Sequence, residues 1–136
     1  MVYVTRRAHF CASHCLANPK WSAEKNLAVF GKCSNPNGHG HNYEIEVTVV
    51  GSPPKETGMV IDLKALGEII EEEVVERVDH KHLNHDVDFL AGVIPTAEHL
   101  AIAFWRILAD RITEGTLHSI RLFESENNFV EYRGEP

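Results

Sequence analysis

Alternating apolar and polar residues predict several β-strands. In the clearest case, at residues 41–50, apolar Tyr43, Ile45, Val47 and Val49 are separated mostly by polar residues. A period of two is typical of a strand with one buried face. Further strands are predicted at residues 2–14, 59–61, 116–124 and 128–133, and the last two would form a hairpin that turns at Glu126-Asn127.

Two other segments have the apolar spacing of amphipathic helices. Apolar residues recur three or four positions apart from Leu63 to Val78, and a second such stripe follows Thr96 as far as Ile112. Asp62 and Thr96 are expected N-caps, because their side chains can accept the free N–H groups of a first helical turn. Residues 15–40 contain several Pro and Gly residues and are predicted to form a long irregular loop, which usually carries function.

The order of these elements predicts an α+β fold. We expect an antiparallel four-stranded sheet with two helices packed on one face. The other face of the sheet must then contact water or another subunit. Residues 1–136 contain no internal repeat and no linker, so they are expected to form a single domain.

Composition and charge narrow the functional class. The content of 43% hydrophobic and 24% charged residues is typical of a soluble globular domain. The net charge of −7 argues against a nucleic-acid partner, because phosphates are bound by clustered Lys and Arg. No apolar run approaches the ~18 residues of a membrane span, and the N-terminus lacks the apolar stretch of a signal peptide. Three cysteines are too few for a disulfide scaffold, so a cytoplasmic protein without a membrane partner is expected.

His39 and His41 flank Gly40 and form the most specific local pattern of the chain. Side chains two positions apart on an extended chain point to the same side, so both imidazoles can bind one metal ion. A catalytic zinc usually has three protein ligands and one open position. His14 is the expected third ligand if the first two strands pair, and His9 is a weaker candidate. The spacing alone leaves open that these histidines are ordinary polar residues.

Two alternative metal sites also follow from the sequence. Cys11 and Cys15 could join His14 in a closed structural zinc site, because thiolates bind zinc well. Against this, a cysteine on a half-buried strand is more often a small core residue. The three histidines within residues 80–85 could form a second site, although such a polar segment after a helix is more often a solvated loop.

Several further residues are candidates for acid/base chemistry. Cys33 lies in the irregular loop, six residues before His39, and its thiol could approach a metal-bound substrate. A free thiol has a pKa of about 8.5 and needs a partner to act as a base near neutral pH. Asp79 and His80 could form that partner pair. Glu124, at the end of a strand, could accept two N–H groups of an amino-pyrimidinone ring, although a surface acid is the simpler interpretation.

Five separated segments together resemble the 6-pyruvoyl-tetrahydropterin synthase family. They are FCASH at 10–14, CSNPNGHGHNY at 33–43, DHK at 79–81, PTAE at 95–98 and FESENN at 123–128. The resemblance covers nearly the whole chain. It implies the tunnelling fold, in which the sheets of several subunits join into a barrel on oligomerisation. It also implies a homohexamer, a dimer of trimers, with active sites between subunits.

The resemblance implies a role for each candidate residue. One Zn²⁺ per subunit would have three histidine ligands, and Mg²⁺ could accompany the triphosphate of the substrate. A cysteine would abstract a proton with the help of an Asp–His pair, and a Glu and a Thr would contact the pterin ring. In this chain the matching residues are the zinc ligands His14, His39 and His41, the catalytic residues Cys33, Asp79 and His80, and the substrate contacts Glu124 and Thr96.

The implied substrate is a small pterin triphosphate, 7,8-dihydroneopterin triphosphate. A zinc-dependent lyase of tetrahydrobiopterin biosynthesis would eliminate triphosphate from it and form 6-pyruvoyl-tetrahydropterin, with Lys25 and Lys32 as candidate triphosphate contacts. The alternative is a 6-carboxy-5,6,7,8-tetrahydropterin synthase of queuosine biosynthesis. Residues 34–38 separate Cys33 from the histidine motif, as in the pyruvoyl-forming branch, whereas the other branch commonly has a shorter spacing. A non-catalytic zinc-binding scaffold is a more remote alternative.

Overall fold

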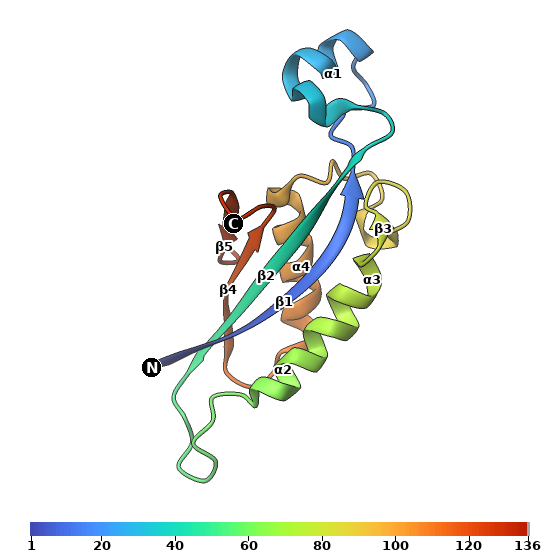
Figure 1. Cartoon of the computed structure of the whole chain (residues 1–136). Coiled ribbons are helices and arrows are strands. Elements are labelled where there is room, and N and C mark those ends of the chain that lie inside the picture. Colours follow the sequence, from blue (N-terminus) through green and yellow to red (C-terminus); the bar gives the residue numbers. More distant parts are fainter. Residues whose placement is uncertain (136) are drawn as a thin grey trace.

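A five-stranded sheet forms the centre of the molecule in the computed structural model, which describes residues 1–135 (Figure 1). The spatial order of the strands is β3-β1-β2-β4-β5. All neighbours are antiparallel except β1 and β3, which are parallel. The strands are β1 (Val2–His14), β2 (His39–Gly51), β3 (Lys81–His82), β4 (Thr116–Phe123) and β5 (Phe129–Tyr132).

Helices cover one face of this sheet (Figure 1). One continuous run contains α2 (Leu63–Ile70), a π-helical turn (Glu71–Val75) and α3 (Glu76–Val78), and it lies beside α4 (Ala97–Arg111). Both predicted N-caps are confirmed. The Asp62 carboxylate accepts the N–H of Lys64 at 2.9 Å, and the Thr96 hydroxyl accepts the N–H of His99 at 3.2 Å.

The core lies between the sheet and these helices. Phe10 of β1 stacks on Tyr43 of β2 at 4.8 Å between ring centroids, and it meets Phe104 of α4 edge-on at 5.9 Å. All three side chains are buried, and each contributes about 1.5–3 kcal/mol by leaving water. The predicted alternation in β2 is confirmed, because Tyr43, Ile45, Val47 and Val49 all face the core.

The opposite face of the sheet is polar and open within one chain. Glu46 lies between Arg7, whose guanidinium donates to its carboxylate at 2.6 Å, and Arg121 at 3.5 Å. Thr5 and Thr48 share a hydrogen bond of 2.7 Å across β1 and β2. The sheet of a single chain is not closed into a barrel, because β3 and β5 lie at its two edges and do not pair with each other.

No helix within residues 1–135 is long and apolar enough to cross a bilayer.

Two predicted elements differ from the structure. The strand predicted at 59–61 was wrong, because this segment bends toward α2 and buries Val60 and Ile61 in the core without strand partners. The fifth strand is instead the short β3, which pairs with Ala12 and Ser13 of β1. The sheet therefore has five strands and one parallel pair, rather than four strands that are all antiparallel.

The irregular loop predicted at 15–40 contains a helix. This helix, α1 (Ala23–Phe30), has Ser22 as its N-cap and is followed by a 3₁₀ turn, Gly31–Ser34. The whole segment between the two strands, residues 15–38, is called the excursion. It leaves from the end of β1, returns at the start of β2 and projects beyond the sheet (Figure 1). Every residue of α1 is exposed or half-buried. The helix therefore needs no apolar stripe, which is the sequence signal that predicted the other helices.

The capping contact of Asp62 yields a stability prediction. Replacing Asp62 by Ala removes the acceptor for the Lys64 N–H and should lower the free energy of unfolding by about 0.5–2 kcal/mol. Asp62→Asn keeps an acceptor and serves as the matched control. Urea unfolding followed by circular dichroism would measure both variants, and equal losses in the two would show that the cap does not stabilise this helix.

Candidate metal centre and active site

The imidazoles of His14, His39 and His41 converge on the helix-covered face of the sheet, where β1 ends and β2 begins. The antiparallel register pairs His14 with His39 and Ala12 with His41. The ring centroids lie 4.7 to 5.1 Å apart, and the nearest ligand atoms of the three residues all lie within 4.8 Å of one another. The expectation that pairing of the first two strands brings these histidines together is confirmed.

The hydrogen bonds around this trio leave its nitrogens available for a metal ion. His14 is fully buried, and its Nδ1 lies 2.8 Å from the carbonyl oxygen of Pro95, an acceptor that requires Nδ1 to carry the proton. The lone pair of His14 is then on Nε2, which lies 3.1 Å from Nε2 of His39. Nε2 of His41 is buried and has no hydrogen-bond partner.

The spacing and electrostatics of the trio fit a divalent metal. Two nitrogens bound to one tetrahedral zinc at about 2.0–2.1 Å lie about 3.3 Å apart, close to the separation of His14 and His39. Burial lowers the pKa of both His14 and His41, which favours the neutral imidazole that a metal requires. A backbone carbonyl that fixes the tautomer of one ligand, as Pro95 does, is a common support for metal-bound histidine.

Glu124 and Tyr43 border the trio. Oε1 of Glu124, just beyond β4, lies 3.1 Å from Nε2 of His41, but the contact lacks hydrogen-bond geometry. The Glu124 carboxylate is partly exposed and free to accept hydrogen bonds from a ligand. The hydroxyl of Tyr43 lies 3.3 Å from Nδ1 of His14, and burial raises its pKa, so the hydroxyl keeps its proton.

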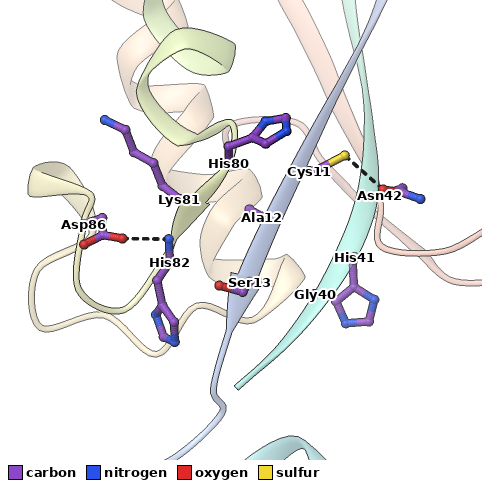
Figure 2. A pocket seen from close by; sticks show the side chains of 10 residues that line it. All are labelled: Cys11, Ala12, Ser13, Gly40, His41, Asn42, His80, Lys81, His82 and Asp86. Carbon is purple, nitrogen blue, oxygen red and sulfur yellow. Dashed lines mark hydrogen bonds between the residues drawn. The ribbon is translucent and has the colours of Figure 1, made fainter. Parts of the chain in front are cut away.

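The other predicted metal ligands lie elsewhere. His9 faces Glu44 and has 72% of its side chain exposed. Sγ of Cys11 lies on the open face of the sheet, 3.0 Å from Oδ1 of Asn42 (Figure 2). Within residues 1–135, the His14 trio is the one group of three such side chains close enough to hold a metal ion. Neither Cys11 and Cys15 with His14 nor the histidines of residues 80–85 form such a group among these residues.

Asp79 and His80 form the expected side-chain pair. Oδ1 of Asp79 accepts the backbone N–H of Cys11 at 2.8 Å, and Oδ2 lies 3.0 Å from Nδ1 of His80. The hydrogen bond from Cys11 is the main reason that the pKa of Asp79 is lowered. The backbone N–H of His80 donates to the Cys11 carbonyl at 2.6 Å, and His80 adopts a positive φ of 61°. Two main-chain contacts with β1 therefore fix this pair.

The Asp79–His80 pair lies beside Cys11 of β1, apart from the trio. Figure 2 shows His80 and His41 on the two sides of β1, around a depression of about 550 Å³. The imidazole of His80 is 81% exposed. Among the residues that the structure describes, no hydrogen bond links Cys33 to Asp79 or His80 within one chain.

Cys33 and Thr96 occupy separate positions in the structure. Cys33 is half-buried in the 3₁₀ turn after α1, and its carbonyl accepts the N–H of Leu16 at 2.8 Å. Thr96 directly follows Pro95, whose carbonyl binds His14, and its hydroxyl caps α4. One chain therefore gathers the three histidines and Glu124, with Thr96 attached through Pro95, whereas Cys33 lies on the excursion.

Sequence reasoning missed the support that Pro95 and Tyr43 give to His14. A carbonyl acceptor has no side-chain signature, although Pro95 lies beside the predicted cap Thr96. Tyr43 was recognised as an apolar position of β2, and the alternation that places it two residues after His41 on the same face was the available signal.

Comparison with known proteins gives a consistent result. Residues 3–135 match the family model described as 6-pyruvoyl tetrahydropterin synthase. A protein from Pongo abelii named 6-pyruvoyl tetrahydrobiopterin synthase is 46% identical over 132 residues, which cover 97% of this chain and 91% of the relative. The solved structure of Caenorhabditis elegans 6-pyruvoyl tetrahydropterin synthase has a TM-score of 0.93 at 35% identity, and the match covers 98% of this chain and 96% of that one. A 6-carboxy-5,6,7,8-tetrahydropterin synthase from Rickettsia bellii is 28% identical over 149 residues, covering 96% of this chain and 99% of the relative.

The positive φ of His80 yields a prediction that separates the effect of its backbone conformation on stability from the effect of its side chain. Glycine adopts this conformation freely, so His80→Gly should keep or raise the free energy of unfolding by up to about 1 kcal/mol, despite losing the exposed side-chain contact with Asp79. His80→Val, the control, should lower it by at least about 1 kcal/mol, because a β-branched residue is strained at positive φ. Chemical denaturation measures both, and similar losses would mean that the ring stabilises this turn.

Proposed function

The chain belongs to the 6-pyruvoyl tetrahydropterin synthase family, and from this membership we propose that it converts 7,8-dihydroneopterin triphosphate into 6-pyruvoyl-tetrahydropterin with the help of zinc. It is an enzyme, a lyase that acts on a triphosphate. The observation that carries the zinc dependence is the convergence of three imidazoles. The Nε2 atoms of His14 and His39 lie 3.1 Å apart, and Nε2 of His41 is buried without a hydrogen-bond partner.

In the proposed mechanism, His14, His39 and His41 would hold the zinc through their imidazole nitrogens. When bound, zinc supplies Lewis acidity toward the side-chain hydroxyls of the substrate and acidifies the neighbouring C–H. Pro95 keeps the proton of His14 on Nδ1. The Glu124 carboxylate accepts N–H groups of the pterin ring, and its position beside His41 supports this role. The Thr96 hydroxyl contacts the ring from the start of α4.

Proton transfer in this proposal begins at Cys33. Its thiolate takes the carbon-bound proton, and Asp79 orients His80 as the acid/base partner, which the 3.0 Å contact between their side chains supports. Lys25 and Lys32 are the proposed triphosphate contacts. Pairing of the triphosphate with Mg²⁺, a single domain over residues 1–136 and a cytoplasmic location stay predictions.

We also propose that the functional unit is a homohexamer of two trimers with active sites between subunits. Two features of the chain support this arrangement. The imidazole of His80 is 81% exposed and lies across β1 from His41, so a neighbouring subunit can receive it. The polar face of the sheet is uncovered in a single chain and could line the interior of a barrel of joined sheets.

The product is the point on which the two synthase types differ. Similarity favours the pyruvoyl product, because the Pongo abelii relative is 46% identical and the Rickettsia bellii 6-carboxy synthase is 28% identical. The longer spacing between Cys33 and His39 favours the same product. The 6-carboxy synthase activity is therefore the second candidate.

The product assay is a direct test. Incubation of the zinc-loaded protein with 7,8-dihydroneopterin triphosphate should yield 6-pyruvoyl-tetrahydropterin and inorganic triphosphate, identified by mass spectrometry. A product that is only 6-carboxy-tetrahydropterin, with release of acetaldehyde, would reverse the assignment within the family. Absence of turnover with about one bound zinc per subunit would favour the scaffold alternative.

Metal content and turnover separate the roles of the site residues. Cys33→Ala should keep about one zinc per subunit while turnover falls by at least about 10²-fold, the usual contribution of a general base. His39→Ala should lose both zinc and turnover. His9→Ala is the matched control, because its exposed imidazole lies outside the trio, and it should keep both. Full turnover in Cys33→Ala would remove Cys33 from the mechanism.

A further inference from the structure

We propose that Cys15 is a resolving thiol for Cys33 and that peroxide converts the two into a reversible disulfide within one chain. The pairing is independent of the reaction catalysed. Its consequence, reversible loss of turnover, rests on the role proposed above for Cys33. The inference follows from the way the excursion folds back on the end of β1.

The main chain places the two cysteines within reach of each other. The N–H of Leu16, one peptide beyond Cys15, donates to the carbonyl of Cys33 at 2.8 Å. Standard bond lengths then limit the two Cα atoms to a separation of about 7.6 Å, reached only if the connecting vectors are collinear. Disulfides span about 4.4–6.8 Å between Cα atoms, so a backbone shift of at most about 1 Å brings the pair into this range.

Cys15 is also held in a fixed orientation. Its backbone N–H donates to Oδ1 of Asn84 at 2.8 Å, and its carbonyl accepts the side-chain N–H of Asn84 at 2.8 Å. Sγ lies 3.5 Å from the carbonyl of Ser34, so the thiol faces the turn that carries Cys33. Because Cys15 is buried, with 9% of its surface exposed, thiols of other molecules have poor access to it.

Cys33, in contrast to Cys15, is less buried and lies in a turn that can adjust. It is half-buried, and it lies in a short 3₁₀ turn that begins at Gly31, whose φ is 60° and whose Cα has open space beside it. A small oxidant can therefore reach the Cys33 thiol, and the turn can adjust to a cross-link. The third cysteine, Cys11, lies on the open face of the sheet beside Asn42 and has no such relation to Cys33.

The chemistry balances with peroxide as the named oxidant. The Cys33 thiolate attacks one oxygen of hydrogen peroxide, the O–O bond breaks, and sulfenic acid and hydroxide form. The Cys15 sulfur then attacks the Cys33 sulfur, the S–O bond breaks, and the disulfide and water form. The two thiols together lose two electrons to peroxide. A small dithiol reverses the reaction by exchange, whereas further oxidation of Cys33 to sulfinic acid would be irreversible.

The test compares the zinc-loaded full chain with Cys11→Ala and Cys15→Ala after treatment with hydrogen peroxide. Trypsin places Cys11 and Cys15 on residues 8–20 and Cys33 on residues 33–55. A non-reducing digest should contain these two peptides cross-linked in the unaltered chain and in Cys11→Ala, in which only Cys15 can pair with Cys33. In Cys15→Ala the cross-link should be missing, and Cys33 should carry sulfinic acid.

Turnover provides the second readout, normalised to the untreated sample of each variant. Peroxide should lower it by at least about 10²-fold in all three proteins, because the base is blocked. Dithiothreitol should restore it in the unaltered chain and in Cys11→Ala but not in Cys15→Ala. The mapping in Cys11→Ala does not depend on how well Cys15→Ala folds.

Two outcomes would overturn the inference. One is a free Cys15 thiol in peroxide-treated Cys11→Ala while Cys33 is oxidised. The other is a cross-link that persists in Cys15→Ala, because it would require Cys11. If the cross-link forms as expected but turnover survives it, the thiol pair stands and the proposed catalytic role of Cys33 fails.

Discussion

The antiparallel ladder between β1 and β2 is the constraint on which the rest of the molecule depends. The register that pairs Phe10 with Tyr43 in the core also pairs His14 with His39 two steps further along the same face. A slip of one residue would move both sets of side chains to the opposite face of the sheet. The apolar contacts of the core therefore hold the histidines in place, and packing beside them offsets the cost of burying the His14 imidazole.

In the loops around this ladder, backbone groups position the side chains of the candidate site. Pro95 binds His14 through its carbonyl, and Cys11 holds Asp79 and His80 through its N–H and C=O groups. These contacts place side chains at the rim without adding bulk to the site. They also explain why the Asp79–His80 turn accepts a positive φ, since two hydrogen bonds to β1 fix its path.

Much of this architecture could be predicted from the sequence. Alternation in β2 and the caps Asp62 and Thr96 are local signals that were confirmed. The spacing of His39 and His41 is another local signal, and it correctly predicted that their imidazoles converge with that of His14. The missed elements lack such signals. Helix α1 has no buried stripe, and β3 is two residues long and exists only because β1 offers an unpaired edge. Val60 and Ile61 have strand-forming side chains, but burial in the core determines their conformation.

The excursion that carries α1 and Cys33 leaves the sheet at one histidine of the trio and returns at another. His14 and His39 are 25 positions apart in sequence and 3.1 Å apart at their Nε2 atoms. An ion bound by both residues would hold the two ends of this long loop together, as a cross-link does. It would thereby reduce the conformational entropy of the loop. Metal loading would then govern the order of the segment that carries Cys33, so chelation should loosen the excursion before it unfolds the sheet.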